Sequence, residues 1–175
     1  DVKNYSYFMP QSRKLWENVP EMLERSVRFY SDKVGSYPYP QVSALEGPLS
    51  AGGGMEYPMI TIIDPIEDKT MLDNIITHEV GHNWFYGILA FDERRYPWMD
   101  EGINSFYEVQ YMHNYYPEHN EVGLPSKISR RIGLFDREGF EVKQLTYAFQ
   151  ASRNMDQPTE LHSCKYSASN YGAVV

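Results

Sequence analysis

The segment His78-Glu79-Val80-Gly81-His82 constrains this chain more than any other part of the sequence. Two histidines four residues apart on a helix share one face, and they stand roughly 6 Å apart along the axis because each residue rises about 1.5 Å. Two imidazole nitrogens on one face can hold a single metal ion, and Glu79 projects to the same side, where it can take a proton from water. The motif therefore predicts a zinc site with a general base. The competing interpretation is two ordinary histidines on an amphipathic helix.

A third ligand is expected, because zinc sites that perform chemistry usually have three protein ligands and one open position, and two His with one Glu is a known set. Glu101 follows His82 with 18 residues between them, an interval that can finish one helix, turn and begin a second. Asp100 is the competing carboxylate, but it lies one residue out of this spacing. A glutamate in a first helical turn is also favoured by the helix dipole, and the two roles are compatible.

The glycine-rich segment Gly52–Pro58 lies upstream of the motif. With HExxH, the 18-residue interval and Glu101, it resembles the M1 family of zinc aminopeptidases, whose usual patterns are G-A-M-E-N and W-L-N-E-G. Here these patterns read Gly53-Gly54-Met55-Glu56-Tyr57 and Trp98-Met99-Asp100-Glu101-Gly102, so each keeps its glutamate while the flanks vary. Tyr37-Pro38-Tyr39-Pro40 adds to the resemblance, which covers about residues 20 to 110 well.

The resemblance implies one zinc ion per chain, held by His78, His82 and Glu101. Such an ion polarises a carbonyl and lowers the pKa of a water molecule to about 7, so that Glu79 can act as general base and pass the proton to the leaving amine. Glu108 falls on the same helix face as Glu101. It is interpreted either as an outer hydrogen-bond acceptor for a ligand histidine or as a solvated glutamate.

The resemblance also implies a peptide substrate with a free N-terminus, whose α-ammonium group Glu56 binds. A cation held at a fixed distance from the metal lets only the first peptide bond reach it, which is the physical basis of an exopeptidase. Gly53, Gly54 and Met55 are expected to help hold the first substrate residue, since glycines let a peptide lie against this edge as an added strand.

Two other functions stay open. A thermolysin-like endopeptidase would use the same zinc ligands, but a glutamate at position 56 that faces a free amine argues against it. A non-catalytic scaffold domain of the same fold would need neither Glu79 nor Glu56, and the presence of both argues against that interpretation.

Composition is compatible with one domain that has a real core, since 42% of the 175 residues are apolar and 15% are aromatic. The net charge of −8 argues against nucleic acid as a partner. The sequence contains no run of 18 apolar residues, so no transmembrane span is expected. The single cysteine, Cys164, excludes an internal disulfide, is interpreted as an inert small side chain and leaves the compartment open.

The chain begins with Asp1-Val2 and ends with Val174-Val175 in mid-pattern. We therefore expect residues 1–175 to be a single domain within a larger M1 catalytic domain, with flanking domains before and after it, and the isolated chain to be weakly active or inactive. The resemblance implies an oxyanion-stabilising tyrosine in a V-Y-x-K-G-like segment, expected just after the last residue. Tyr166 and Tyr171 are rivals, but neither is followed by Lys-Gly.

The pattern predicts an α+β fold that is mainly helical, and the resemblance adds a thermolysin-like zinc core with a small mixed sheet. Pro20 suits a first helical position with Asn18 as cap, and Gly35 suits a helix stop. Residues 1–14 show no clear period, and a glycine-rich loop is expected before Glu56. The expected helices cover Pro20–Lys33, Thr70–Leu89 and Asp100 or Glu101 to Tyr116, with weaker patterns over 125–132 and 138–152, and the expected strands cover Gln41–Glu46 and Met59–Ile63.

Overall fold

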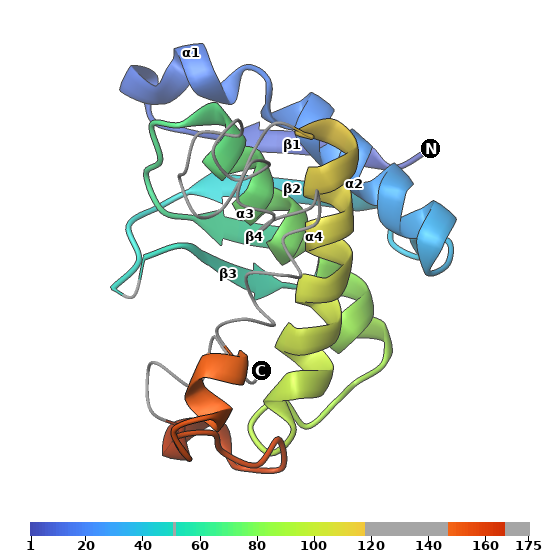
Figure 1. Cartoon of the computed structure of the whole chain (residues 1–175). Helices are drawn as coiled ribbons and strands as arrows, with labels where there is room; N and C mark the ends of the chain where they lie inside the picture. The colour runs from blue at the N-terminus through green and yellow to red at the C-terminus, as the bar shows by residue number, and fades with distance from the viewer. Residues whose placement is uncertain (51, 118–146, 167–175) are drawn as a thin grey trace. The chain divides into compact units, whose positions relative to one another are not determined.

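The computed structural model describes residues 1–50, 52–117 and 147–166 of the chain. The chain forms two compact units, Asp1–Ala90 and Phe91–Val175. Figure 1 shows the elements of both units in the order of the sequence. Among the described residues, no helix has the length and apolar character that crossing a membrane requires.

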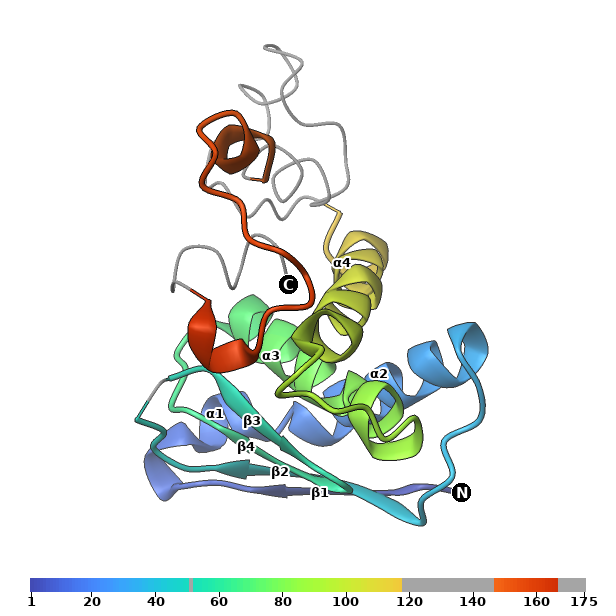
Figure 2. The same cartoon turned by 90° about the horizontal axis from the view of Figure 1, so that it is seen from below.

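The first unit is built on a mixed sheet of four strands in the order β1-β2-β4-β3 (Figure 2). β1 (Lys3–Tyr7) runs parallel to β2 (Gln41–Glu46), β2 runs parallel to β4 (Ile60–Ile63), and β3 (Gly54–Tyr57) runs antiparallel to β4. β3 is thus an edge strand. In the part of the chain that the structure describes, its outer edge pairs with no other strand.

Two helices, α2 (Val19–Lys33) and α3 (Lys69–Gly81), pack against each other. α2 also packs against β1 and β2, and α3 packs against β3 and β4. A short helix, α1 (Arg13–Trp16), precedes them, after a 3₁₀ turn, η1 (Pro10–Ser12). The predicted helix over Pro20–Lys33 is confirmed to within one residue. Its buried side chains recur at three- and four-residue intervals, as expected for one helix face packed on a core; they are Val19, Met22, Leu23, Ser26, Val27, Phe29 and Tyr30.

Polar contacts lock α3 to α2. The Arg25 guanidinium forms an ion pair with the fully buried Asp73 carboxylate. One turn further along α3, the Thr77 and Ser26 hydroxyl oxygens lie 2.7 Å apart in a buried hydrogen bond. Because Thr77 directly precedes His78, these contacts fix the rotation of α3 about its axis next to the motif.

The predicted motif helix over Thr70–Leu89 is wrong at its C-terminal end. α3 ends at Gly81, and a π-helical turn, η2 (Asn83–Ile88), follows, in which Phe85 leaves helical geometry at φ −88° and ψ 40°. Tertiary contacts explain the break: the Trp84 indole N–H donates to the Gly35 carbonyl at 2.7 Å, and the Trp84 ring stacks on Tyr30 with 5.3 Å between centroids. These contacts outweigh the local preference for a continuous α-helix.

Two strands were not predicted. β1 reads Lys-Asn-Tyr-Ser-Tyr, a polar and half-exposed edge strand without an apolar run. β3 lies where a glycine-rich loop is expected, because glycine weakens the strand signal. The predicted strand over Met59–Ile63 begins one residue later, since Met59 belongs to the turn between β3 and β4.

The second unit contains a π-helical turn, η3 (Trp98–Gly102), which leads directly into α4 (Ile103–Tyr115). Residues 147–151 are helical, and a 3₁₀ turn, η4 (Ser163–Lys165), follows. The predicted second helix is therefore present but opens with a π-helical turn. The predicted helix over 125–132 and most of that over 138–152 lie outside the described residues.

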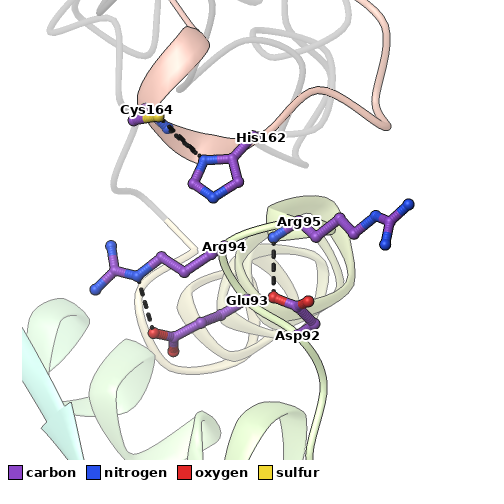
Figure 3. A network of polar contacts seen from close by, with 6 residues as sticks. All are labelled: Asp92, Glu93, Arg94, Arg95, His162 and Cys164. Carbon is purple, nitrogen blue, oxygen red and sulfur yellow. Dashed lines mark hydrogen bonds and ion pairs between the residues drawn. The ribbon is translucent and has the colours of Figure 1, made fainter.

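Figure 3 shows how the η4 segment meets the turn at residues 92–95. The Ser163 amide donates to the Arg94 carbonyl at 2.7 Å, and the Cys164 sulfur lies 3.1 Å from His162 Nδ1. Asp92 Oδ1 accepts from the Arg95 amide at 3.1 Å within the turn itself. Cys164 is a free, exposed cysteine.

Candidate metal centre

The two motif histidines lie together at the C-terminal end of α3. Their Nε2 atoms are 3.2 Å apart, and their ring planes meet at 80° with 4.8 Å between centroids. Two zinc–nitrogen bonds of 2.0–2.1 Å at a tetrahedral angle would separate the nitrogens by roughly 3.3 Å. The observed spacing of His78 and His82 therefore fits two ligands of one ion, and His82 is 2% exposed, as a rigid ligand requires.

Glu79 is buried beside strand β3. A Cβ atom built on Gly54 would lie 2.5 Å from both Cγ and Cδ of Glu79, and it would also clash with the Glu79 Oε1 atom. No side chain fits at position 54 unless Glu79 moves, so glycine allows this close approach of strand and carboxylate. The backbone of β3 therefore forms one wall of the Glu79 site.

Strand alternation explains why Glu56 joins this site. Gly54 and Glu56 are two residues apart on β3 and so face the same side of the sheet. One carboxylate oxygen each of Glu56 and Glu79 and one ring nitrogen of His82 lie within 4.8 Å of one another. The first unit thus brings together the predicted amine-binding glutamate, the predicted base and a predicted ligand.

The remaining predicted substrate-binding residues flank this cluster. Gly53 has a φ of +75°, a conformation that glycine adopts without strain, and its carbonyl accepts from the Asp64 amide at 2.9 Å. Met55 sits between Gly54 and Glu56, so its side chain points to the opposite face of the sheet. The Met55 carbonyl accepts from the Thr61 hydroxyl at 3.1 Å.

Asn83 is a polar residue of this region that the sequence analysis did not identify. It is buried, its Oδ1 atom accepts from the Met59 amide at 2.9 Å and from the Tyr37 hydroxyl at 3.4 Å, and its Nδ2 atom donates to the Val80 carbonyl at 2.9 Å. Burial, and then the neighbouring Tyr39, raise the pKa of Tyr37 above its ordinary value. The sequence does contain a signal for this role, because Asn83 follows the second ligand histidine directly, and short amide side chains bond readily to nearby backbone groups.

The second unit holds the other predicted site residues. Glu101 is half-buried in η3, and its competitor Asp100 is 3% exposed. Glu108 is 8% exposed on α4, which argues against a solvated side chain. Because Glu101 and Glu108 belong to a different unit from the two histidines, their assignments as ligand and outer partner stay predictions.

Comparison with known proteins adds a family to this geometry. Residues 18–171 match the Peptidase family M1 domain. Mouse aminopeptidase Q is 30% identical over 94 residues, which cover 47% of this chain and 17% of that protein. Bovine endoplasmic reticulum aminopeptidase 2 is 29% identical over 118 residues, which cover 59% of this chain and 12% of that protein. Aminopeptidase N of Lactobacillus delbrueckii subsp. lactis is 27% identical over 100 residues, which cover 50% of this chain and 12% of that protein. The aligned part of the chain thus spans less than a fifth of the length of these relatives.

Proposed function

Because the chain belongs to peptidase family M1, whose domain matches residues 18–171, we propose that its protein is a zinc-dependent aminopeptidase. It would release N-terminal residues from peptides with a free α-amine, as the names of its relatives suggest. The observation that carries this proposal is the convergence of Glu56 with Glu79 and His82 within 4.8 Å. An anionic group beside a base and a metal ligand is what recognition of a substrate amine next to the reacting bond requires.

We propose that His78, His82 and Glu101 hold one zinc ion. The nitrogen spacing of the two histidines supports their share of the ligand set. Glu101 is proposed from the 18-residue interval and from the resemblance of its segment to the family pattern. When bound, zinc would supply Lewis-acid chemistry: it would polarise a carbonyl oxygen and lower the pKa of water, so that water can lose a proton and act as a nucleophile at neutral pH.

Glu79 is proposed as the general base. Its carboxylate is buried against the backbone of β3, so its position is restricted before substrate arrives. From there it takes a proton from the attacking water and passes it to the leaving amine. Such a positioned group typically contributes about 100- to 10,000-fold to the rate.

Glu56 is proposed to bind the substrate α-ammonium group, and the outer edge of β3 is proposed to carry the substrate backbone. An extended peptide can add to an open sheet edge through main-chain hydrogen bonds. Gly53, Gly54 and Met55 would contact the first substrate residue there. Since Glu56 lies within 4.8 Å of both the base and one ligand, only a bond next to the amine would reach the reacting groups.

At the level of the fold, the α+β arrangement with a small mixed sheet is compatible with a thermolysin-like catalytic core. We propose that residues 1–175 form part of an M1 catalytic domain that works together with flanking domains. In the relatives the matched region is 12–17% of the protein, which leaves room for such domains.

A paired-peptide assay on the full-length protein tests this function. We expect hydrolysis of a peptide with a free N-terminus and none of its N-acetylated twin. Glu79→Gln should lower kcat by about 100-fold or more. Glu21→Gln, at an exposed position of α2, is the matched control and should match wild type. Internal cleavage of the acetylated peptide would instead establish an endopeptidase, and full activity of Glu79→Gln would exclude Glu79 as the base.

A further inference from the structure

Asn83 connects two parts of the first unit that carry different site residues. It follows His82 directly and opens the π-helical turn η2. Its side chain is 4% exposed, and its carboxamide bonds to the Met59 amide, the Tyr37 hydroxyl and the Val80 carbonyl. The geometry gives Asn83 no place among the ligands or the base, so its role must be exerted through its partners.

The partner that matters most is Met59, in the turn between β3 and β4. Met59 has a φ of 67°, in the left-handed region that non-glycine residues adopt only with backbone strain. A positive φ after a proline is typical of a tight turn, and Pro58 precedes Met59 here. The turn is held from both sides, because Asn83 Oδ1 accepts from the Met59 amide at 2.9 Å and the Met59 carbonyl accepts from the Ser43 amide at 2.9 Å.

The Asn83–Met59 hydrogen bond therefore joins the end of the motif helix to the end of β3. His82 is one residue from Asn83, and Glu56 is three residues from Met59 on the strand that enters the turn. Tyr37 contributes less to this link, because its single hydroxyl hydrogen also has the nearer Gln41 carbonyl as acceptor, at 3.0 Å rather than 3.4 Å.

We propose that Asn83 is a positioning residue that sets the distance between Glu56 and the motif helix, and thereby restricts cleavage to the first peptide bond. This inference rests on the proposed aminopeptidase function. When the link is lost, the turn can relax from its left-handed conformation, and β3 can shift against α3. Glu56 then meets the substrate amine in the wrong register, while the histidines keep their own helix.

The test compares steady-state kinetics of full-length variants on alanine and leucine p-nitroanilides, which carry a free α-amine. Asn83→Ala should raise KM by about 10-fold, within the loss of up to about 100-fold that a 1 Å misplacement can cause. We expect kcat to change less than about 3-fold and zinc content to stay at one per chain. Tyr37→Phe, which perturbs the same carboxamide without touching the Met59 link, should keep the wild-type KM.

A double-mutant cycle with Glu56→Gln separates a specific effect of Asn83 on the position of Glu56 from a general loss of rigidity in the first unit. If Asn83 acts through Glu56, Asn83→Ala should no longer raise KM in the Glu56→Gln background. Asn83→Asp, which keeps an acceptor for the Met59 amide, should restore part of the wild-type KM. Should Asn83→Ala not fold, Asn83→Ser takes its place, because its hydroxyl stops one bond short of the Oδ1 position.

The outcomes distinguish this inference from the function on which it rests. A wild-type protein that turns over no free-amine substrate overturns both. If the wild type turns over these substrates normally, three results would overturn only the role of Asn83. They are a wild-type KM in Asn83→Ala, an unchanged effect of Asn83→Ala on KM in the Glu56→Gln background, or an equal rise of KM in Tyr37→Phe.

Discussion

The two segments that carry the candidate zinc ligands are held in different ways. α3 begins at a capped end, where the Asp68 side chain accepts from the Met71 amide at 2.8 Å, and its flank is locked to α2 by the Arg25–Asp73 ion pair. η3, which carries Glu101, begins after Pro97 without a side-chain cap. Yet α3 leads into a π-helical turn, η2, and η3 is itself a π-helical turn, a feature common at functional sites. α3 is thus capped and joined to α2 by a buried ion pair, whereas η3 has no side-chain cap and leads directly into α4.

The largest expected effect tests the third ligand. Glu101→Ala should lower zinc affinity by more than the roughly 10- to 100-fold that loss of an outer partner causes, and Glu108→Gln should fall within that range. Asp100→Asn, next to Glu101 and more buried, is the matched control and should keep the wild-type affinity. Titration with a zinc chelator measures all three. A greater loss in Asp100→Asn than in Glu101→Ala would transfer the ligand role to Asp100.

The next effect concerns the lock on α3. Asp73→Asn should lower the free energy of unfolding by about 2 kcal/mol, because it weakens a charge-assisted hydrogen bond at a fully buried position. Glu24→Gln, which breaks the exposed pair between Glu24 and Arg28, should cost less than about 1 kcal/mol. Urea unfolding followed by circular dichroism compares the two variants. Equal losses would show that the buried pair does not hold α3 in place.

A smaller effect tests the wall of the Glu79 site. Gly54→Ala should lower kcat by about 10-fold while zinc is retained, because the new methyl group displaces the carboxylate from its geometry. Gly47→Ala is the control, since its Cβ would meet only the Cγ2 methyl group of Ile62, at 3.3 Å, and no site residue. The family pattern usually has alanine at position 54, so an unchanged kcat would mean that Glu79 has a second productive position.

The smallest effect is a pH dependence at Tyr37. Its pKa is raised in the folded chain, so between the ordinary value of 10.0 and the folded value the unfolded chain has lost a proton that the folded chain keeps. Stability from this group is therefore complete below pH 10 and falls as the pH rises further. Tyr37→Phe should cost about 1 kcal/mol at pH 8 through lost hydrogen bonds, and the difference from wild type should shrink above pH 10. A constant difference up to pH 11 would contradict the raised pKa.

Sequence reasoning succeeded where one local pattern decides the structure. The helix from Val19 and the strand Gln41–Glu46 follow from apolar spacing and from Pro20, and the motif itself placed His78 and His82 on one helix face. It failed where partners distant in sequence decide. The stacking of Trp84 on Tyr30 ends the regular helix, and no local pattern encodes that contact.

The same division applies to the candidate site. Glu56 and Glu79 could be named from their motifs, and the chain folds so that they lie close together. The link through Asn83 could not be named, because it depends on the left-handed conformation of Met59 and on the register that brings this turn to the helix end.

A zinc ion on the motif helix underlies the proposed function, and elemental mass spectrometry of the purified protein measures its presence. We predict one zinc per chain in the wild type and almost none in His82→Ala, with Glu21→Gln as a control that keeps its zinc. Absence of zinc from the wild type after incubation with the ion at neutral pH, or a full complement of zinc in His82→Ala, would exclude a zinc site built on His78 and His82.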